Sequence, residues 1–230
     1  MNNLIDDLNN LSRSKLQKIA KSFQVSTSGD KNTLVDNIYN RYYDIKKYIS
    51  YTYVRQLGHE GKDGRTFLAT DEKGQECAIK IFKKTKKSKS IIREAKLQTI
   101  AADHGLSPAI VDYDGDGKYI VMEKLDTNLF DLFRQQNGEL TISQQKAVIK
   151  LFKKLDECKI FHADPNPLNF MKKGNKWYII DFGFAKPINS YTIHKYGMTP
   201  NMKYMPIGLI LKLRGIYANS KLEYLEKYVQ

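Results

Sequence analysis

Three oxygen-bearing side chains, Asp164, Asn169 and Asp181, lie close together in the sequence. Asp164 and Asn169 are five positions apart in a proline-containing stretch between apolar segments, and Asp181 follows the apolar run 177–180. A carboxylate can accept the proton of an attacking hydroxyl, and carboxylate and amide oxygens are the ligands that Mg²⁺ prefers. Phosphoryl transfer needs these groups. Taken singly, Asp164 and Asn169 are also typical of turns, and Asp181 of a strand end.

The spacing of the three residues resembles motifs of the protein-kinase-like superfamily. Residues 162–169 are H-A-D-P-N-P-L-N and residues 181–183 are D-F-G. This matches the family order H-x-D-x-x-x-x-N followed by D-F-G. The resemblance implies that Asp164 is the catalytic base, and that Asn169 and Asp181 hold Mg²⁺, with Mn²⁺ as an alternative ion.

A glycine-rich stretch between two predicted strands extends the resemblance. Gly58, Gly61 and Gly64 resemble the kinase loop whose backbone N–H groups approach the phosphates of ATP, because glycine removes the obstruction of a Cβ atom. The spacing here is G-x-x-G-x-x-G, one residue longer than G-x-G-x-x-G of the family. Glycine-containing hairpins are also common outside kinases.

Lys80 interrupts the otherwise apolar strand predicted for residues 77–82, and a buried ammonium needs a partner. The segment 78–80, A-I-K, resembles the V-A-I-K strand of kinases, which implies that Lys80 holds the α- and β-phosphates of ATP. Glu94, in a helix predicted to begin near Ile91, is the implied partner of Lys80. Glu94 can instead be a solvated charge of that helix.

Two more strands are predicted at 106–111 and 118–123, around the turn 114–117. The D-G-D-G sequence of this turn favours a hairpin over a calcium site, because no ligand-bearing loop with a terminal Glu follows. In the kinase comparison Met122 would guard the back of the adenine pocket. Glu123 and Leu125 would belong to the hinge whose backbone holds the base.

The sequence departs from ordinary kinases in ways that resemble atypical branches of the superfamily. Asn166 occupies the position of the usual lysine, so another cation must meet the γ-phosphate. Lys186 is our candidate, although it can also be a surface lysine. The H-A-D-P-N-P-L-N segment resembles UbiB-type kinases and, less closely, RIO kinases, but the glycine-rich stretch and the missing K-x-G-Q motif argue against a UbiB relative. The small size and composition resemble kinases of large DNA viruses, and residues 188–230 lack an A-P-E motif, which implies a reduced C-terminal lobe.

The segment 11–42 predicts two short helices around a polar turn, with Ser12 and Asp30 as N-caps. It resembles the SAP motif, which often binds DNA in its family. The resemblance implies phosphate contacts from a set of lysines: Lys15, Lys18, Lys21 and Lys31. Alternatively, these helices pack on the next domain or dock a partner.

The composition of the 230-residue chain limits the classes of protein it can belong to. It carries 38 Lys and Arg against 25 Asp and Glu, a net charge of +13 that favours polyanionic partners. The lysine-rich segment 83–89 is typical of a solvated loop, with docking of nucleic acid as the alternative. Cys77 and Cys158 are the only cysteines, which excludes a disulfide framework.

No secretory signal and no run of about 20 apolar residues is found, so we expect no membrane association. The expected location is intracellular and cytoplasmic. A viral protein would be in the host cytoplasm or the virion, and the nucleus is an alternative.

Together these patterns predict an α+β, two-lobed protein-kinase-like fold. A SAP-like helical module (1–45) precedes a lobe with a small antiparallel sheet (51–125) and a reduced helical lobe (126–230). Helices are predicted at 128–136, 142–157, 207–218 and 220–229, with chain breaks at Pro200 and Pro206.

The predicted function is transfer of phosphate from ATP to Ser or Thr hydroxyls of a protein substrate. One alternative is a pseudokinase, or an ATP-binding switch or ATPase of the atypical type. Another is a nucleic-acid-tethered binding protein that uses residues 1–45.

Overall fold

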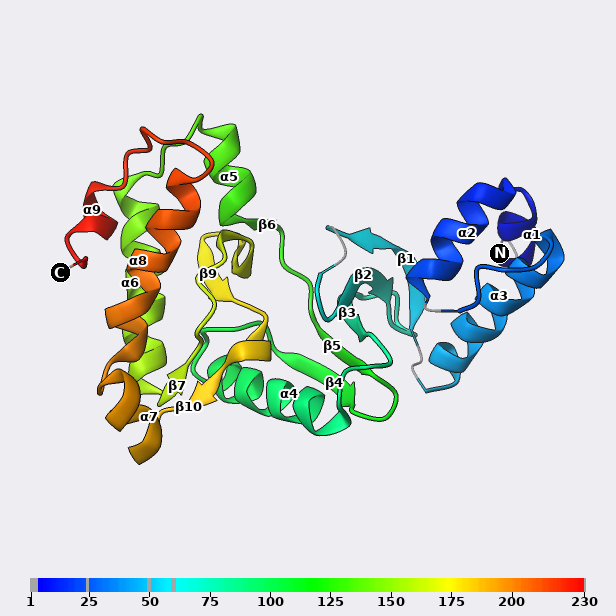
Figure 1. The fold of residues 1–230 in the computed structure, drawn as a ribbon, viewed down its shortest axis with the longest axis horizontal. Coiled ribbons are helices and arrows are strands. Elements are labelled where there is room, and N and C mark those ends of the chain that lie inside the picture. Colours follow the sequence, from blue (N-terminus) through cyan, green and yellow to red (C-terminus); the bar gives the residue numbers. More distant parts are fainter. Residues whose placement is uncertain (1–3, 24, 49–50, 59–60, 230) are drawn as a thin grey trace. The chain divides into compact units, whose positions relative to one another are not determined.

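The computed structural model describes residues 4–23, 25–48, 51–58 and 61–229 (Figure 1). The chain divides into two compact units, which are described separately. The first is Met1–Ser88 with Asp114–Tyr119, and the second is Lys89–Tyr113 with Ile120–Gln230. Helices and antiparallel strands are both present, so the predicted α+β class is confirmed.

Three helices open the first unit: α1 (Leu4–Asn9), α2 (Arg13–Ser22) and α3 (Lys31–Tyr48). Both predicted N-caps are confirmed, because Ser12 accepts a hydrogen bond from the backbone N–H of Lys15 and Asp30 accepts one from that of Thr33. Helix α1 was not predicted from the sequence, and α3 extends beyond the predicted limit at residue 42. The helices share a small apolar core that includes Leu16, Leu34 and Ile38.

Strands β1 (Thr52–Leu57), β2 (Gly64–Thr70) and β3 (Glu76–Phe82) form antiparallel pairs in the order β1-β2-β3. Phe23, at the end of α2, stacks on Phe67 of β2 with ring centroids 6.2 Å apart. A cavity of about 260 Å³ lies beside this contact, lined by residues from the helices and from β1 and β2. The N-terminal helices therefore pack on the sheet, as one of the two readings of this segment predicted.

Only some elements of the second unit were predicted from the sequence. Helices α5 (Leu129–Gln135) and α6 (Ile142–Glu157) lie where the sequence predicted them. Its remaining elements before residue 188 are α4 (Ser88–Asp103), β4 (Ile110–Asp114), β5 (Tyr119–Glu123), β6 (Thr127–Asn128), β7 (Ile160–Phe161), the 3-10 turn η1 (Pro167–Asn169), β8 (Phe170–Lys173), β9 (Lys176–Ile179), the 3-10 turn η2 (Phe182–Phe184) and β10 (Lys186–Pro187). Strands β6, β8 and β9 form one small sheet, and β7 pairs with β10.

Three further helices follow residue 188: α7 (Ser190–Tyr196), α8 (Pro200–Arg214) and α9 (Glu223–Glu226). Two predictions for this segment are wrong. Pro206 does not break the chain but lies inside α8, where its side chain is buried although the residue has no N–H group to donate. The helix predicted at 220–229 is also wrong in length, because α9 is a single turn.

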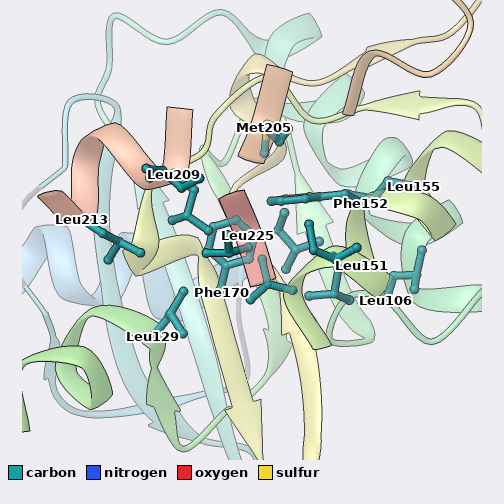
Figure 2. Packing of buried hydrophobic residues seen from close by; sticks show 14 of the residues in the cluster. Leu106, Leu129, Leu151, Phe152, Leu155, Phe170, Met205, Leu209, Leu213 and Leu225 are labelled. Carbon is teal, nitrogen blue, oxygen red and sulfur yellow. The ribbon is translucent and has the colours of Figure 1, made fainter. Parts of the chain in front are cut away.

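The core of the second unit positions α8 beside α6 (Figure 1). Figure 2 shows Met205, Leu209 and Leu213 of α8 together with Phe152 of α6 and Phe170 of β8. All five side chains are almost fully buried. Burial of such side chains is the main stabilising contribution to folding. It fixes α8 and β8, which flank the loop that carries Asp164.

Candidate active site

The loop 162–169 connects β7 to β8, and a hydrogen bond fixes the backbone at its first residue. The backbone N–H of His162 donates to Oδ1 of Asn201, at a distance of 3.0 Å. Ala163 then adopts a left-handed conformation, with φ of 64°. A residue other than glycine rarely adopts this conformation unless its surroundings impose it. The turn at Ala163 determines where the side chain of Asp164 lies.

Each carboxylate oxygen of Asp164 accepts a hydrogen bond from a different element. Nδ2 of Asn169 donates to Oδ2 at 2.9 Å, and Nζ of Lys212 in α8 lies 3.2 Å from Oδ1. The Asp164 side chain is 18% exposed, so it is largely shielded but still accessible. The carboxylate is therefore held in one orientation with solvent access, as a general base requires.

Asn166, at the position of the usual kinase lysine, has a local structural role. Its side-chain oxygen accepts a hydrogen bond from the backbone N–H of Leu168, at 3.1 Å, and so caps the turn η1. Pro167 occupies the first position of that turn, where a missing N–H costs nothing. The turn places Asn169 next to Asp164.

Asp181 lies at the same end of the β8–β9 hairpin as Asn169. Phe170 pairs with Ile179, and the backbone N–H of Ile180 donates to the carbonyl oxygen of Asn169 at 2.9 Å. Asp181 has φ of 65° and accepts a long hydrogen bond from the N–H of Gly183. The hairpin thus brings together the segments of the three predicted residues, Asp164, Asn169 and Asp181.

His162 connects the two segments through its ring. Nε2 lies 3.0 Å from the carbonyl oxygen of Ile180, and because a carbonyl only accepts, Nε2 carries the proton. The ring packs edge-on against Phe182, with centroids 4.9 Å apart. Burial lowers the pKa of His162 below its ordinary value of 6.5, against the opposing effect of its bond to Ile180. The imidazole is therefore neutral, and it connects the start of the loop 162–169 to Ile180 and Phe182.

This lowered pKa predicts a pH dependence of stability. The unfolded state binds a proton at His162 near pH 6.5, whereas the folded state does so only at lower pH. The free energy of unfolding should therefore fall by up to about 1.4 kcal/mol per pH unit as the pH drops below 6.5. Urea unfolding of the wild type and His162→Gln, followed by the fluorescence of Trp177, checks this.

Trp177 is the only tryptophan in the chain, and it packs against the core of the second unit, so its fluorescence reports on that unit. The difference in pH dependence between the wild type and His162→Gln gives the contribution of His162, because the other titrating groups are common to both proteins. If the free energy of unfolding changed equally with pH in both proteins, His162 would not be a neutral imidazole in the folded state.

A buried carboxylate anchors α8 to α6. Asp156 accepts hydrogen bonds from the backbone N–H groups of Asn201 and Met202, each at 3.0 Å, and from Nδ2 of Asn201 at 2.7 Å. An anion at a helix N-terminus is favourable because the first N–H groups lack partners within the helix. Burial raises the pKa of Asp156, although the bonds from Asn201 and Met202 oppose this.

Sequence reasoning missed Asp156 and Asn201. Asn201 also donates to the carbonyl oxygen of Ile160, at 2.6 Å, so its side chain joins α6, α8 and β7. One signal was present: Asp156 lies four positions after Phe152, on the apolar face of the predicted helix. A buried carboxylate there needs a partner.

The first unit contains the predicted phosphate-binding residues. Gly64 must be glycine, because a Cβ atom there would lie 2.1 Å from the carbonyl oxygen of Ile81. Gly58 has φ of +66°, which glycine adopts readily. The N–H of Gly61 donates to the carbonyl oxygen of Gly64. His59 and Glu60 of this stretch lie outside the described residues.

Lys80 lies in β3 opposite Thr66 of β2, so the two side chains share one face of the sheet. Its Nζ is 5.0 Å from the centroid of the Phe82 ring, which lies on the same face. Glu94 belongs to α4 of the second unit and is 1% exposed. Glu94 is thus not a solvated charge, and its pairing with Lys80 stays a prediction.

The predicted adenine-binding residues lie at the end of β5 and just beyond it. Met122 and Leu125 are buried, and Sδ of Met122 lies 3.5 Å from Nε2 of Gln98. The N–H of Glu123 donates to the carbonyl oxygen of Ala109, and its side chain pairs with Lys173 at 2.6 Å. These contacts fix the segment in which we expect the backbone to hold adenine.

Lys186 is exposed, and its place at the γ-phosphate stays a prediction. Nζ of Lys186 lies 5.5 Å from the centroid of the Tyr196 ring, whereas Lys212 contacts Asp164. Within the segment 83–89, Lys86 is not solvated: its side chain is 15% exposed and pairs with Asp63 at 2.5 Å. A solvated loop therefore describes only part of that segment.

A family model of the protein kinase domain matches residues 51–214. The match covers more than half of the chain, and the chain belongs to the protein kinase family. Protein kinase domains transfer phosphate from ATP to protein, with the help of divalent metal ions. None of the helices within the described residues is long and apolar enough to cross a membrane.

The donor set at the β8–β9 hairpin fits a magnesium ion. Asn169 uses its NH₂ group to bond Asp164, so its carbonyl oxygen can serve as a metal ligand. The carboxylate of Asp181 provides a second hard oxygen donor. Among the described residues, no cluster of three or more His, Cys, Asp or Glu side chains forms a metal site of another type.

Proposed function

We propose that this protein transfers the γ-phosphoryl group of ATP to Ser or Thr hydroxyls of a protein substrate. The observation that carries the proposal is the orientation of Asp164, whose carboxylate accepts a hydrogen bond from Nδ2 of Asn169 at 2.9 Å. A carboxylate fixed in this way can orient a substrate hydroxyl and accept its proton.

Each of the other predicted residues has a role in this mechanism. Asn169 and Asp181 would hold Mg²⁺, or Mn²⁺ in its place, and the ion would neutralise charge on the phosphates. Lys80, oriented by Glu94, binds the α- and β-phosphates beneath the glycine-rich stretch from Gly58 to Gly64. The segment from Met122 to Leu125 receives adenine. These assignments rest on motif order and on the local geometry within each unit.

The test is incubation of the purified protein with radiolabelled ATP and Mg²⁺, with a basic protein as acceptor and with autophosphorylation measured in parallel. We expect label on phosphoserine or phosphothreonine, and its loss when the metal is chelated. Label on phosphotyrosine alone, or no label on protein in any condition, would overturn the proposal.

Removal of the Lys80 side chain should abolish most of the transfer. An ammonium group that contacts transferring phosphates contributes about 10²–10³-fold in rate. Lys80→Ala should lower kcat/KM for ATP by that factor and leave the circular dichroism spectrum unchanged. The matched control is Lys73→Ala, an exposed lysine in the turn between β2 and β3. Equal activity of the Lys80 variant and this control would remove Lys80 from the site.

A pseudokinase or an ATP-binding switch is the second candidate, favoured by the extra residue between Gly58 and Gly61 and by Asn166 in place of lysine. It predicts binding of ATP without transfer to protein. Isothermal titration with ATP, run beside the labelling assay, separates the two functions. ATP turnover without labelled protein would favour the ATPase form of this candidate.

Nucleic-acid binding by residues 1–45 is a third candidate, and the SAP-like resemblance and exposed Lys15 and Lys21 favour it. Lys31 donates to the carbonyl oxygen of Asn9 and thus already has a structural contact. A DNA gel shift that weakens steeply with salt and is lost in Lys15→Glu/Lys21→Glu would support this candidate. No shift at low salt would end it.

A further inference from the structure

One side of helix α8 contacts the loop 162–169, which carries Asp164. Gly208 and Lys212 lie seven and eleven positions after Asn201. Because an α-helix turns by about 100° per residue, these three residues lie on the same side of α8. Asn201 bonds His162, Gly208 meets Pro165, and Lys212 reaches Asp164.

The contact at Gly208 sets the distance between α8 and the loop. A Cβ atom at Gly208 would lie 2.4 Å from Cγ of Pro165, closer than atoms can approach. Pro165 follows Asp164 directly, so only a glycine lets α8 come near the catalytic carboxylate. Lys212, one turn further along α8, then lies 3.2 Å from Oδ1 of Asp164.

Lys212 brings positive charge to a loop that has no lysine at position 166. Asn166 caps η1, and Lys186 lies over the Tyr196 ring. The Lys212 side chain is 44% exposed, and that of Asp164 18%, so the pair is at the surface of the unit. An ion pair whose lysine is in contact with solvent contributes little to stability, so we do not expect this contact to be needed for the fold.

We propose that Lys212 is a positioning residue of the catalytic base, resting on the kinase function proposed above. In the reaction, the substrate hydroxyl oxygen attacks the γ-phosphorus while its proton passes to Asp164. The bond from the γ-phosphorus to the bridging oxygen breaks, and ADP leaves with the electron pair. Lys212 and Asn169 hold the carboxylate in the orientation that accepts this proton. Because a carboxylate can accept more than two hydrogen bonds, it can still accept one from the substrate hydroxyl.

The test compares Lys212→Met, Lys212→Arg and the matched control Lys203→Met, an exposed lysine on the same helix. A hydrogen bond from a charged donor corresponds to about 10- to 100-fold in rate. Lys212→Met should lower kcat by that factor and leave KM for ATP within about twofold, because the lost contact acts on the base. Lys212→Arg should restore most of kcat, and Lys203→Met should match the wild type.

Urea unfolding followed by Trp177 fluorescence provides a readout that separates positioning from structure. We expect the unfolding midpoint of Lys212→Met to equal that of the wild type. Wild-type kcat in Lys212→Met, or a loss of kcat that only follows a loss of stability, would overturn the role of Lys212 alone. No phosphoryl transfer by the wild type would overturn the proposed function, and the role of Lys212 with it.

Discussion

Asp164→Asn is expected to lower kcat by about 10²–10⁴-fold, the usual contribution of a general base. The amide has the shape of the carboxylate and keeps an oxygen for the hydrogen bond from Asn169. It cannot, however, accept the proton of the substrate hydroxyl at neutral pH. Rates of phosphate transfer at saturating ATP measure the effect, and Asp164→Ala should show a loss at least as large.

Asp103→Asn is the matched control for this prediction. Asp103 is exposed at the end of α4, so its variant should keep the wild-type rate. Circular dichroism should show both variants folded. A rate for Asp164→Asn within a factor of three of the control would exclude Asp164 as the base.

Asn201→Leu is expected to reduce the free energy of unfolding of the second unit by about 3 kcal/mol. The substitution removes the side-chain donor to Asp156, an acceptor for His162 N–H and a donor to Ile160. Asp156 is 5% exposed, so water can hardly replace the lost partner. Urea unfolding followed by Trp177 fluorescence measures the loss.

A second substitution tests the cause of that loss. Asp156→Asn, added to Asn201→Leu, removes the buried charge and should recover part of the lost stability. Asn219→Leu, at an exposed asparagine beyond α8, is the control and should change stability by less than about 0.5 kcal/mol. A loss in Asn201→Leu no larger than in this control would show that the buried network does not anchor α8.

Local signals in the sequence were sufficient for several elements. The apolar spacing of residues 142–157 predicted α6, and Ser12 and Asp30 predicted the starts of α2 and α3. These features depend on neighbours within one or two helical turns, which a single sequence contains. The spacing of Asp164 and Asn169 likewise predicted a shared loop, and the structure joins their side chains by a hydrogen bond of 2.9 Å.

Features that depend on distant parts of the chain could not be predicted. Lys212 is 48 positions from Asp164, and its contact depends on how α8 packs. Pro206 is a helix breaker by local rules, yet it lies buried inside α8, whose packing against α6 a local rule does not include. Asp156 and Asn201 are each unremarkable locally and form a network only after α6 and α8 meet.

A crystal structure of the protein with a non-hydrolysable ATP analogue and Mg²⁺ tests the central arrangement most directly. We expect Lys80 at the α- and β-phosphates, the oxygens of Asn169 and Asp181 on the metal ion, and Asp164 facing the γ-phosphate. A structure in which the analogue binds elsewhere, or in which these four side chains point away from it, would contradict the proposed phosphoryl transfer.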